Sequence, residues 1–306
     1  MRTRWSVRWI LGLVLALLLG CCGGRALAAS YGQSWLDVDY VGDGIVGHRL
    51  DIYTPAAGSG PFPVLIVLYG SAWARDDRKG PTGAVSANVW CPLGFAIVSI
   101  NHRSSHDVPF PAQIHDVKAA IRFVRANADV YSLDPNRIGL SGGSSGAHLA
   151  ALAGTSGDVG EYTILEETID LEGNLGPYVG TSSRVHAVCT MASPTDFLMK
   201  DACDPEVSLA PEEALIGGPL LDNVALCGFA NPITYVDPSD PPFRMFHGSE
   251  DLAVPHCQSA ALRNALLMAG VPVEYTLVEG AGHGNLGTVE VSMQILEFFQ
   301  DVLGES

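Results

Sequence analysis

The sequence predicts an α/β protein with a doubly wound, mostly parallel sheet, helices on both faces and lid-like insertions. Short, almost wholly apolar runs alternate with stretches of helical periodicity, as is typical of parallel sheets. The 306 residues are 47% hydrophobic, enough to bury one large core. Strands that are covered on both faces have apolar runs of this kind. The runs are FPVLIVLYG, FAIVSIN, RIGLS, VHAVCTMA, FRMFHG and VEYTLVEG.

Helical periodicity appears between and after these runs. PAQIHDVKAAIRFVRANA repeats apolar residues three or four positions apart, as one buried helix face requires. HCQSAALRNALLMAG predicts a second helix, closed by Gly270, and VEVSMQILEFFQDVL predicts a third near the C-terminus.

Ahead of the apolar runs, the sequence predicts an antiparallel hairpin. WLDVDYV and HRLDIYTP both alternate apolar and polar residues, and GDGIVG separates them. The separator also matches the glycine pattern of dinucleotide-binding loops, but that motif must open a helix. An alternating strand follows instead, so we do not expect a nucleotide site.

Residues 1–28 have the pattern of an export signal. Three arginines precede the apolar run WILGLVLALLLG, and ALA at 26–28 is a small-residue cleavage site. The apolar run is short against the roughly 20 residues that span a bilayer. We therefore expect an exported protein, periplasmic or extracellular, in which residues 29–306 form a single domain. Lipoprotein processing at Cys21, which ends the lipobox-like LLGC, is the alternative.

Two segments depart from the alternation of strands and helices. Residues 155–186 and 195–235 are acidic, rich in glycine and proline, and weakly periodic. In α/β sheets, loops at the carboxyl ends of the strands surround the ligand site. We expect these insertions to form a lid or pocket wall, and surface excursions away from the site are the alternative.

The charge of the chain restricts its partners. The formal net charge is −16, and residues 1–28 carry four arginines and no acids, so the charge without them is −20. Nucleic-acid binding relies on Lys and Arg at phosphates. We therefore expect no nucleic-acid partner, and no membrane contact beyond a lipid anchor at Cys21.

Five cysteines lie beyond the export signal, and an odd number leaves at least one thiol free. A Cys203–Cys227 disulfide is one interpretation, because these two flank one irregular segment; five buried thiols is the other. No cysteine or histidine spacing indicates a metal site, and no cofactor is expected. The five are Cys91, Cys189, Cys203, Cys227 and Cys257.

Ser144 lies in GGSSGAH, with Gly142 and Gly146 at G-x-S-x-G spacing. The strand-like RIGLS precedes it and the helix-like SGAHLAALAG follows. This is the context of a nucleophile elbow, whose sharp turn exposes a serine hydroxyl above the sheet. The sequence thus predicts that Ser144 is a nucleophile, and a close-packed turn of small residues is the alternative.

A serine hydroxyl becomes a nucleophile at neutral pH only with a base and an orienting acid. The chain order in this architecture is serine, acid, histidine. Asp251 follows the strand-like FRMFHG, and His283 follows VEYTLV. Since loops after parallel strands meet at one sheet edge, we expect both beside Ser144, with Glu250 as the rival acid.

An acyl-transfer intermediate also needs hydrogen-bond donors for its oxyanion. We expect the backbone N–H groups of Ser71, Ala72 and Ser145, the first two in the loop YGSAWARDD. His148, one turn after Ser144, is expected to pack behind the elbow, and His247 to be structural. Three aromatic residues are expected near the pocket: Tyr69, Trp73 and His256.

The segments RIGLSGGSSGAHLAAL, NPITYVDPSDPPFRMFHGSEDLAVP and VEGAGHG resemble the α/β-hydrolase superfamily. Over about residues 45–303, the chain resembles exported carboxylesterases grouped with bifunctional xylan deacetylase/feruloyl esterases and hormone-sensitive-lipase-like esterases. The resemblance implies the α/β-hydrolase fold and a triad of Ser144, Asp251 and His283.

One loop departs from the family pattern. Such esterases usually have HGGG or HGGA followed by an aromatic, whereas this chain has YGSAW over residues 69–73. The histidine helps to order the loop in look-alike enzymes, so Tyr69 bears on efficiency and substrate range more than on reaction type.

These observations predict a serine carboxylesterase that cleaves short-chain or aromatic acyl esters through an acyl-enzyme. Export and the resemblance favour acetyl or feruloyl groups on plant-wall polysaccharide, or a small ester. A serine peptidase or a lipase on the same fold is one alternative. A catalytically silent binding protein that keeps the fold is the alternative from another class.

Overall fold

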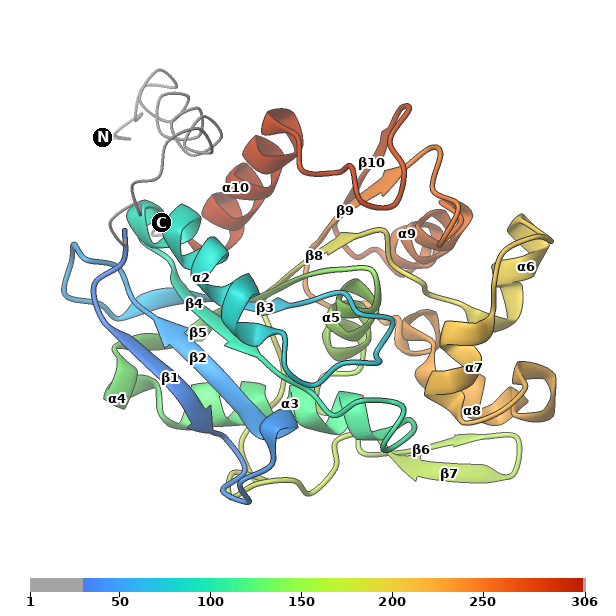
Figure 1. Ribbon diagram of the computed structural model, residues 1–306, viewed down its shortest axis with the longest axis horizontal. Helices are drawn as coiled ribbons and strands as arrows, with labels where there is room; N and C mark the ends of the chain where they lie inside the picture. Colours follow the sequence, from blue (N-terminus) through green and yellow to red (C-terminus); the bar gives the residue numbers. More distant parts are fainter. Residues whose placement is uncertain (1–29, 305–306) are drawn as a thin grey trace.

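The six apolar runs and the two strands of the predicted hairpin form an eight-stranded sheet in the computed structural model, which describes residues 30–304 (Figure 1). The predicted export signal and Cys21 lie outside these residues. The strand order is β1-β2-β4-β3-β5-β8-β9-β10, and every neighbouring pair from β4 to β10 is parallel. The strands of this sheet are β1 (Ser34–Asp39), β2 (Arg49–Tyr53), β3 (Phe62–Leu68), β4 (Ala96–Ile100), β5 (Leu133–Gly143), β8 (Ala187–Met191), β9 (Phe243–Gly248) and β10 (Val273–Val278).

The predicted hairpin is present at one edge of the sheet. β1 pairs antiparallel with β2, and β2 pairs antiparallel with β4. The separator GDGIVG leads into a single 3-10 turn, Val46–His48, and directly into β2. The glycines therefore open a strand, as the alternation in the sequence indicated.

Helices cover both faces of the sheet, which confirms the predicted fold class. Buried residues of α3, α5 and α9 share one core cluster, and those of α2 and α10 share another. Helices α3, α9 and α10 lie where periodicity predicted them, whereas α2 was not predicted. The helices are α2 (Lys79–Trp90), α3 (Ala112–Ala126), α4 (Ala128–Tyr131), α5 (Ser145–Thr155), α6 (Lys200–Cys203), α7 (Ala210–Ile216), α8 (Val224–Ala230), α9 (Cys257–Ala269) and α10 (Val289–Leu303).

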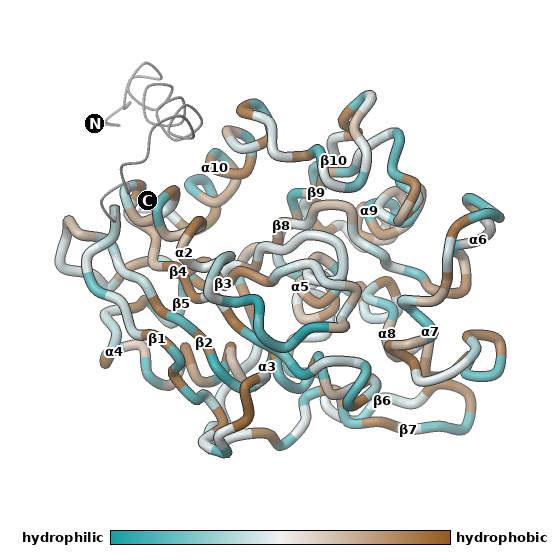
Figure 2. The backbone as a smooth tube through the Cα atoms, in the orientation of Figure 1, coloured by the Kyte–Doolittle hydropathy of each residue, from teal (hydrophilic) through white to brown (hydrophobic). Residues whose placement is uncertain are grey.

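Helix α10 shows how periodicity sets the packing. Val291, Ile295, Phe299 and Leu303 recur every four residues, and all four are buried against the sheet. The opposite face is polar, so the helix alternates between brown and teal in Figure 2. Burial of this one face holds α10 on the sheet.

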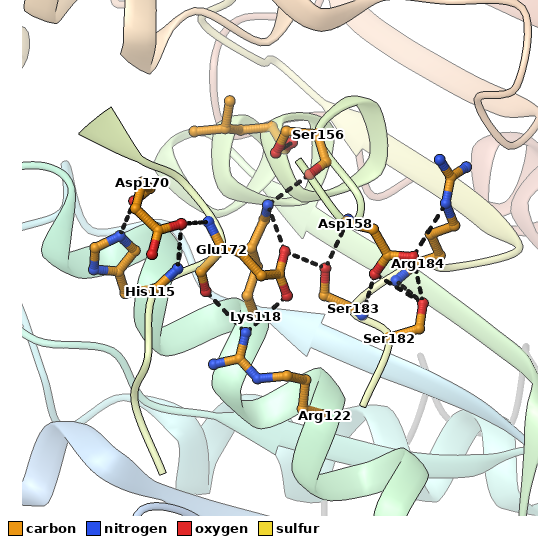
Figure 3. A network of polar contacts seen from close by, with 12 residues as sticks. His115, Lys118, Arg122, Ser156, Asp158, Asp170, Glu172, Ser182, Ser183 and Arg184 are labelled. Carbon is orange, nitrogen blue, oxygen red and sulfur yellow. Dashed lines mark hydrogen bonds and ion pairs between the residues drawn. The ribbon is translucent and has the colours of Figure 1, made fainter. Parts of the chain in front are cut away.

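The first insertion, residues 155–186, contains a two-stranded hairpin of β6 (Glu161–Ile164) and β7 (Glu167–Asp170). A buried polar network fixes its end to α3 (Figure 3). Glu172 accepts hydrogen bonds from Lys118 Nζ at 3.0 Å and from Arg122 Nη1 at 2.7 Å, and both cations are fully buried. Removing the carboxylate would leave two uncompensated buried charges, so the hairpin is firmly attached there.

The second insertion, residues 195–235, folds into α6, α7 and α8, which lie together at one side of the sheet in Figure 1. Its disulfide corrects the predicted pairing. Cys203, at the end of α6, is bonded to Cys257, the first residue of α9. Cys227 is fully buried within α8 instead, with its Sγ toward the Leu220 carbonyl, so it does not face Cys203.

Candidate active site

Ser144 occupies the sharp turn between β5 and α5. Its backbone has φ 54° and ψ −125°, a conformation that is strained for a residue with a side chain. The flanking glycines are required by close contact: a Cβ on Gly142 would lie 2.4 Å from the Gly146 oxygen, and one on Gly146 would lie 2.4 Å from the Leu68 oxygen. The turn therefore has the geometry that G-x-S-x-G predicted.

The structure brings Ser144, His283 and Asp251 into one hydrogen-bonded line. Ser144 Oγ lies 2.9 Å from His283 Nε2, and His283 Nδ1 lies 2.7 Å from Asp251 Oδ2. An ionised carboxylate only accepts, so Nδ1 carries the proton and Nε2 is free to accept from the serine hydroxyl. Glu250, the rival acid, is exposed and makes no hydrogen bond with His283.

His247 also holds the acid, a role that sequence reasoning missed. Its Nε2 lies 2.8 Å from the Val254 oxygen and 3.3 Å from Asp251 Oδ2, and its Nδ1 lies 2.7 Å from Ser259 Oγ. The N–H groups of Ala253 and Val254 donate to Asp251 Oδ1 at 2.9 Å each. The only signal in the sequence is that His247 precedes Asp251 by four residues.

These donors keep the acid ionised. Burial raises the pKa of the Asp251 carboxyl, but the hydrogen bonds from His247, His283 and the Val254 N–H outweigh burial and hold the pKa well below its usual range. Asp251 therefore remains a carboxylate at neutral pH and can stabilise a protonated His283.

One of the three backbone N–H groups predicted to bind the oxyanion, that of Ser71, is not free to do so. The N–H of Ser71 donates to Ser145 Oγ at 2.8 Å, so that amide is already bonded. The N–H of Ala72 meets no acceptor within residues 30–304, and Ser145 opens α5, where first-turn N–H groups have no intrahelical partner. Two of the three predicted donors are thus available. The sequence could not show that the Ser145 hydroxyl accepts this hydrogen bond, because the direction of the hydroxyl depends on the side-chain rotamer.

Aromatic side chains order this loop. Tyr69 donates from its hydroxyl to the Arg75 oxygen at 2.9 Å, and its ring stacks on His102 with centroids 5.0 Å apart. Trp73 Nε1 donates to His148 Nδ1 at 3.2 Å. Tyr69 thus holds the start of the loop to Arg75, six residues further along the chain.

Two of the three expected pocket residues lie elsewhere. Trp73 lines the pocket, but Tyr69 is buried behind the loop and His256 is exposed outside the lining. His148 packs behind the elbow as expected, with Nε2 donating to the Ala230 oxygen at 2.8 Å.

A cavity of about 530 Å³ lies over Ser144. The second insertion supplies one of its walls, as predicted, whereas no residue of the first insertion lines it. Lys200 and Glu212 form a buried ion pair in this wall, with Nζ 2.8 Å from Oε1. The lining consists of Gly70, Ser71, Ala72, Trp73, Gly143, Ser144, Ser145, Met191, Pro194, Lys200, Pro211, Glu212, Ala253, Val254, His283, Gly284, Leu286 and Gly287.

Residues 30–304 hold no group of three or more His, Cys, Asp or Glu side chains arranged to bind a metal ion. Over the same range, no helix combines the length and the apolar character needed to cross a membrane.

The sheet order, the serine elbow and the loops that carry Asp251 and His283 are those of an α/β hydrolase. Within that class, the chain belongs to the BD-FAE family, whose model matches residues 50–266.

Relatives and solved structures agree with this assignment. Esterase LipQ of Mycobacterium tuberculosis is 34% identical over 245 residues, which are 79% of this chain and 55% of that protein. A solved truncated carbohydrate esterase from gut microbiota is 38% identical, with a TM-score of 0.86 over 90% of this chain and 98% of that one. A bifunctional GH43-CE protein of Bacteroides eggerthii is 43% identical, with a TM-score of 0.83 over 90% and 39%. The chain spans about half the length of the curated relatives it matches.

Proposed function

We propose that this protein is a serine carboxylesterase that hydrolyses short-chain or aromatic acyl esters through an acyl-enzyme. One observation carries the proposal: Ser144, His283 and Asp251 are joined by hydrogen bonds of 2.9 and 2.7 Å, and Ser144 and His283 line an accessible cavity. Similar proteins named an esterase and a carbohydrate esterase support the same reaction.

The geometry suits a two-step reaction. His283 Nε2 takes the proton of Ser144 as Oγ attacks the ester carbonyl carbon, and Asp251 stabilises the imidazolium. The N–H groups of Ala72 and Ser145 bind the oxyanion. The bond to the alcohol oxygen then breaks, and the proton on His283 goes to the departing alcohol. Water attacks the acyl-enzyme, gives its proton to His283, and releases the acid while Ser144 recovers its proton. No cofactor is required.

We infer export, with acylated plant-wall polysaccharide as the substrate class. Residues 1–28 have the pattern of an export signal, and the Cys203–Cys257 disulfide is typical of an oxidising compartment. The solved neighbour named a carbohydrate esterase supports an acylated carbohydrate. Fractionation of cells that express the full chain tests export, and labelling with a lipid precursor tests an anchor at Cys21.

A panel of chromogenic esters from acetyl through octanoyl to feruloyl tests the reaction. We expect wild type to hydrolyse some of them and Ser144→Ala to lose at least about 10⁴-fold in rate. A fluorophosphonate probe should label Ser144 in wild type alone. A wild type no faster than the variant on every ester would refute the esterase, and peptidase activity or a silent binding protein would then be tested next.

A further inference from the structure

The Lys200–Glu212 pair is the one charged feature of the pocket besides the proposed base, among the residues that the structure describes. Both side chains come from the second insertion, and each is 1% exposed. The remaining lining outside the elbow and the oxyanion loop consists of glycine and apolar residues. An ion pair in such surroundings loses hydration on both groups, and its mutual attraction often does not repay that cost. Its presence is therefore unexplained by stability alone.

The pair is also incompletely bonded. Glu212 Oε1 accepts from Lys200 Nζ at 2.8 Å, but Oε2 is buried and has no hydrogen-bond partner. Nζ donates to two acceptors, Glu212 Oε1 and the Ser208 oxygen at 3.0 Å, and an ammonium group has three N–H bonds. The pair thus keeps one acceptor, Glu212 Oε2, and one donor, the third N–H of Lys200, without a partner among the described residues.

A buried acceptor without a donor destabilises the protein until a donor reaches it. Glu212 Oε2 is covered in this structure, but the residue belongs to the pocket lining, so a donor bound in the pocket reaches Oε2 after a small shift of the wall. The occupant that fits both groups is a hydroxyl with a second oxygen on the neighbouring carbon. The hydroxyl would donate to Glu212 Oε2, and the neighbouring oxygen would accept from Lys200 Nζ.

We propose that Glu212 and Lys200 determine substrate specificity by binding adjacent oxygens of the substrate, at least one of them a hydroxyl. The inference rests on the proposed esterase function, because it assigns a role in the same pocket. Two parts of an ester carry this chemistry: the neighbouring hydroxyls of a sugar alcohol, and the hydroxyl and methoxy oxygens of a feruloyl ring. The pair would bind the two adjacent oxygens of either group in the same way. The experiment shows which of the two parts of the ester is bound.

The test compares esters in matched pairs. Methyl ferulate is set against its methyl ether, which blocks the phenol, and a monoacetylated xyloside against cyclohexyl acetate, which lacks the hydroxyls. For one pair, we expect wild type to favour the hydroxylated ester about tenfold to hundredfold in kcat/KM, the range of one hydrogen bond to a charged group. The pair that shows the preference identifies the part of the substrate bound.

Removing both charges should abolish that preference. Lys200→Met/Glu212→Leu leaves no unpaired buried charge, and such replacements are often neutral for stability. We expect its preference to fall below about threefold, measured as the ratio of kcat/KM for the hydroxylated ester to kcat/KM for its matched ester. Lys79→Met/Asp51→Leu removes another buried pair, away from the pocket, and should keep the preference.

The outcomes separate the two proposals. If wild type cleaves para-nitrophenyl acetate but favours neither hydroxylated ester, this inference is overturned and the proposed esterase function stands. The same holds if the double variant keeps the preference. A wild type that cleaves no ester refutes the esterase, and the inference with it. If the double variant does not fold, inhibition of wild type decides: guaiacol or methyl xyloside should inhibit at least tenfold more strongly than veratrole or cyclohexanol, and equal inhibition overturns the inference.

Discussion

The serine elbow and the oxyanion loop lie side by side, and both contain non-glycine residues with positive φ, but they support that backbone in opposite ways. At the elbow, Gly142 and Gly146 let backbone atoms approach so closely that a Cβ would be 2.4 Å from a carbonyl oxygen. In the loop, Ala72 and Trp73 have φ of 51° and 57°, and side chains from other elements hold the backbone there. One turn depends on the absence of side chains and the other on their presence.

The two kinds of support differ in how visible they are in the sequence. Close backbone contact requires glycine at fixed positions, so the elbow at Ser144 could be found from the motif G-x-S-x-G. A loop held by pairs of side chains can be stabilised by many different residue pairs, such as Trp73 with His148 here, so it leaves no fixed motif. Substitutions at each turn should therefore fail in different ways.

The largest effect is expected at the elbow. In Gly146→Ala, the added Cβ would lie 2.4 Å from the Leu68 oxygen and 2.6 Å from the Tyr69 oxygen, and neither backbone can move freely. We expect a loss of about 3 kcal/mol or more in the free energy of unfolding, and loss of ester hydrolysis. Urea unfolding and the chromogenic panel measure both. Gly180→Ala, whose Cβ would meet nothing within 4 Å, is the control, and equal losses in the two would contradict this account.

The next effect concerns the histidine that supports the loop. Burial lowers the pKa of His148 to about 4, from about 6.5 in an unfolded chain. Between these values the unfolded chain binds the proton and the folded chain does not, so stability falls as the pH drops from about 6.5 to about 4, by up to about 3 kcal/mol.

His148→Gln removes this titration. We expect its unfolding free energy to change less with pH over the same window, as measured by urea unfolding at several pH values. An unchanged pH dependence would mean that other groups titrate there.

A smaller effect is expected for Tyr69→Phe. The change removes the hydrogen bond to the Arg75 oxygen and keeps the ring on His102, so we expect a loss of about 1 kcal/mol in stability. We also expect a lower kcat, because the Ala72 N–H would be less well positioned. Tyr235→Phe loses a similar bond, to the Phe229 oxygen, away from the loop. It should lose stability alone, and a fall in kcat in both variants would rule out positioning by Tyr69.

The smallest effect is expected for Ala72→Gly, which places glycine at a left-handed backbone position. Relief of strain should slightly outweigh the added freedom of the unfolded chain, so we expect a gain of up to about 1 kcal/mol. Ala261→Gly, within helix α9, should lose about that amount. Thermal unfolding of both variants checks the sign, and a loss in both would show that the loop is not strained at residue 72.

The fold could be predicted wherever burial imposes a period. The strands of the eight-stranded sheet and the helices α3, α9 and α10 follow from apolar runs, alternation and repeats, whereas β6 and β7 were not predicted. Helix α2 could not be predicted, because its sequence, KGPTGAVSANVW, contains two glycines and a proline and buries mainly small residues. Its position comes from contacts such as Gly83 against Ser99, which no local pattern encodes.

Part of the candidate site could likewise be predicted from the sequence, and part could not. Ser144, Asp251 and His283 could be placed because chain order and strand ends bring them to one edge of the sheet. The bond from the Ser71 N–H to Ser145 Oγ, and that between His247 and the acid, depend on rotamers and could not. The Lys200–Glu212 pair lies in an insertion without periodicity, so its place in the pocket became visible only with the fold.

The Cys203–Cys257 disulfide closes a loop of 54 residues that contains most of the second insertion, β9 and the loop of Asp251. In the chain-entropy model, a crosslink of that span stabilises the folded state by about 4 kcal/mol. The same polypeptide made with reduced thiols would retain the sheet and the serine elbow but hold one pocket wall less firmly. The host chosen to produce this protein thus becomes an experimental variable, and preparations from oxidising and reducing cells should be compared before any substrate preference is assigned to the sequence.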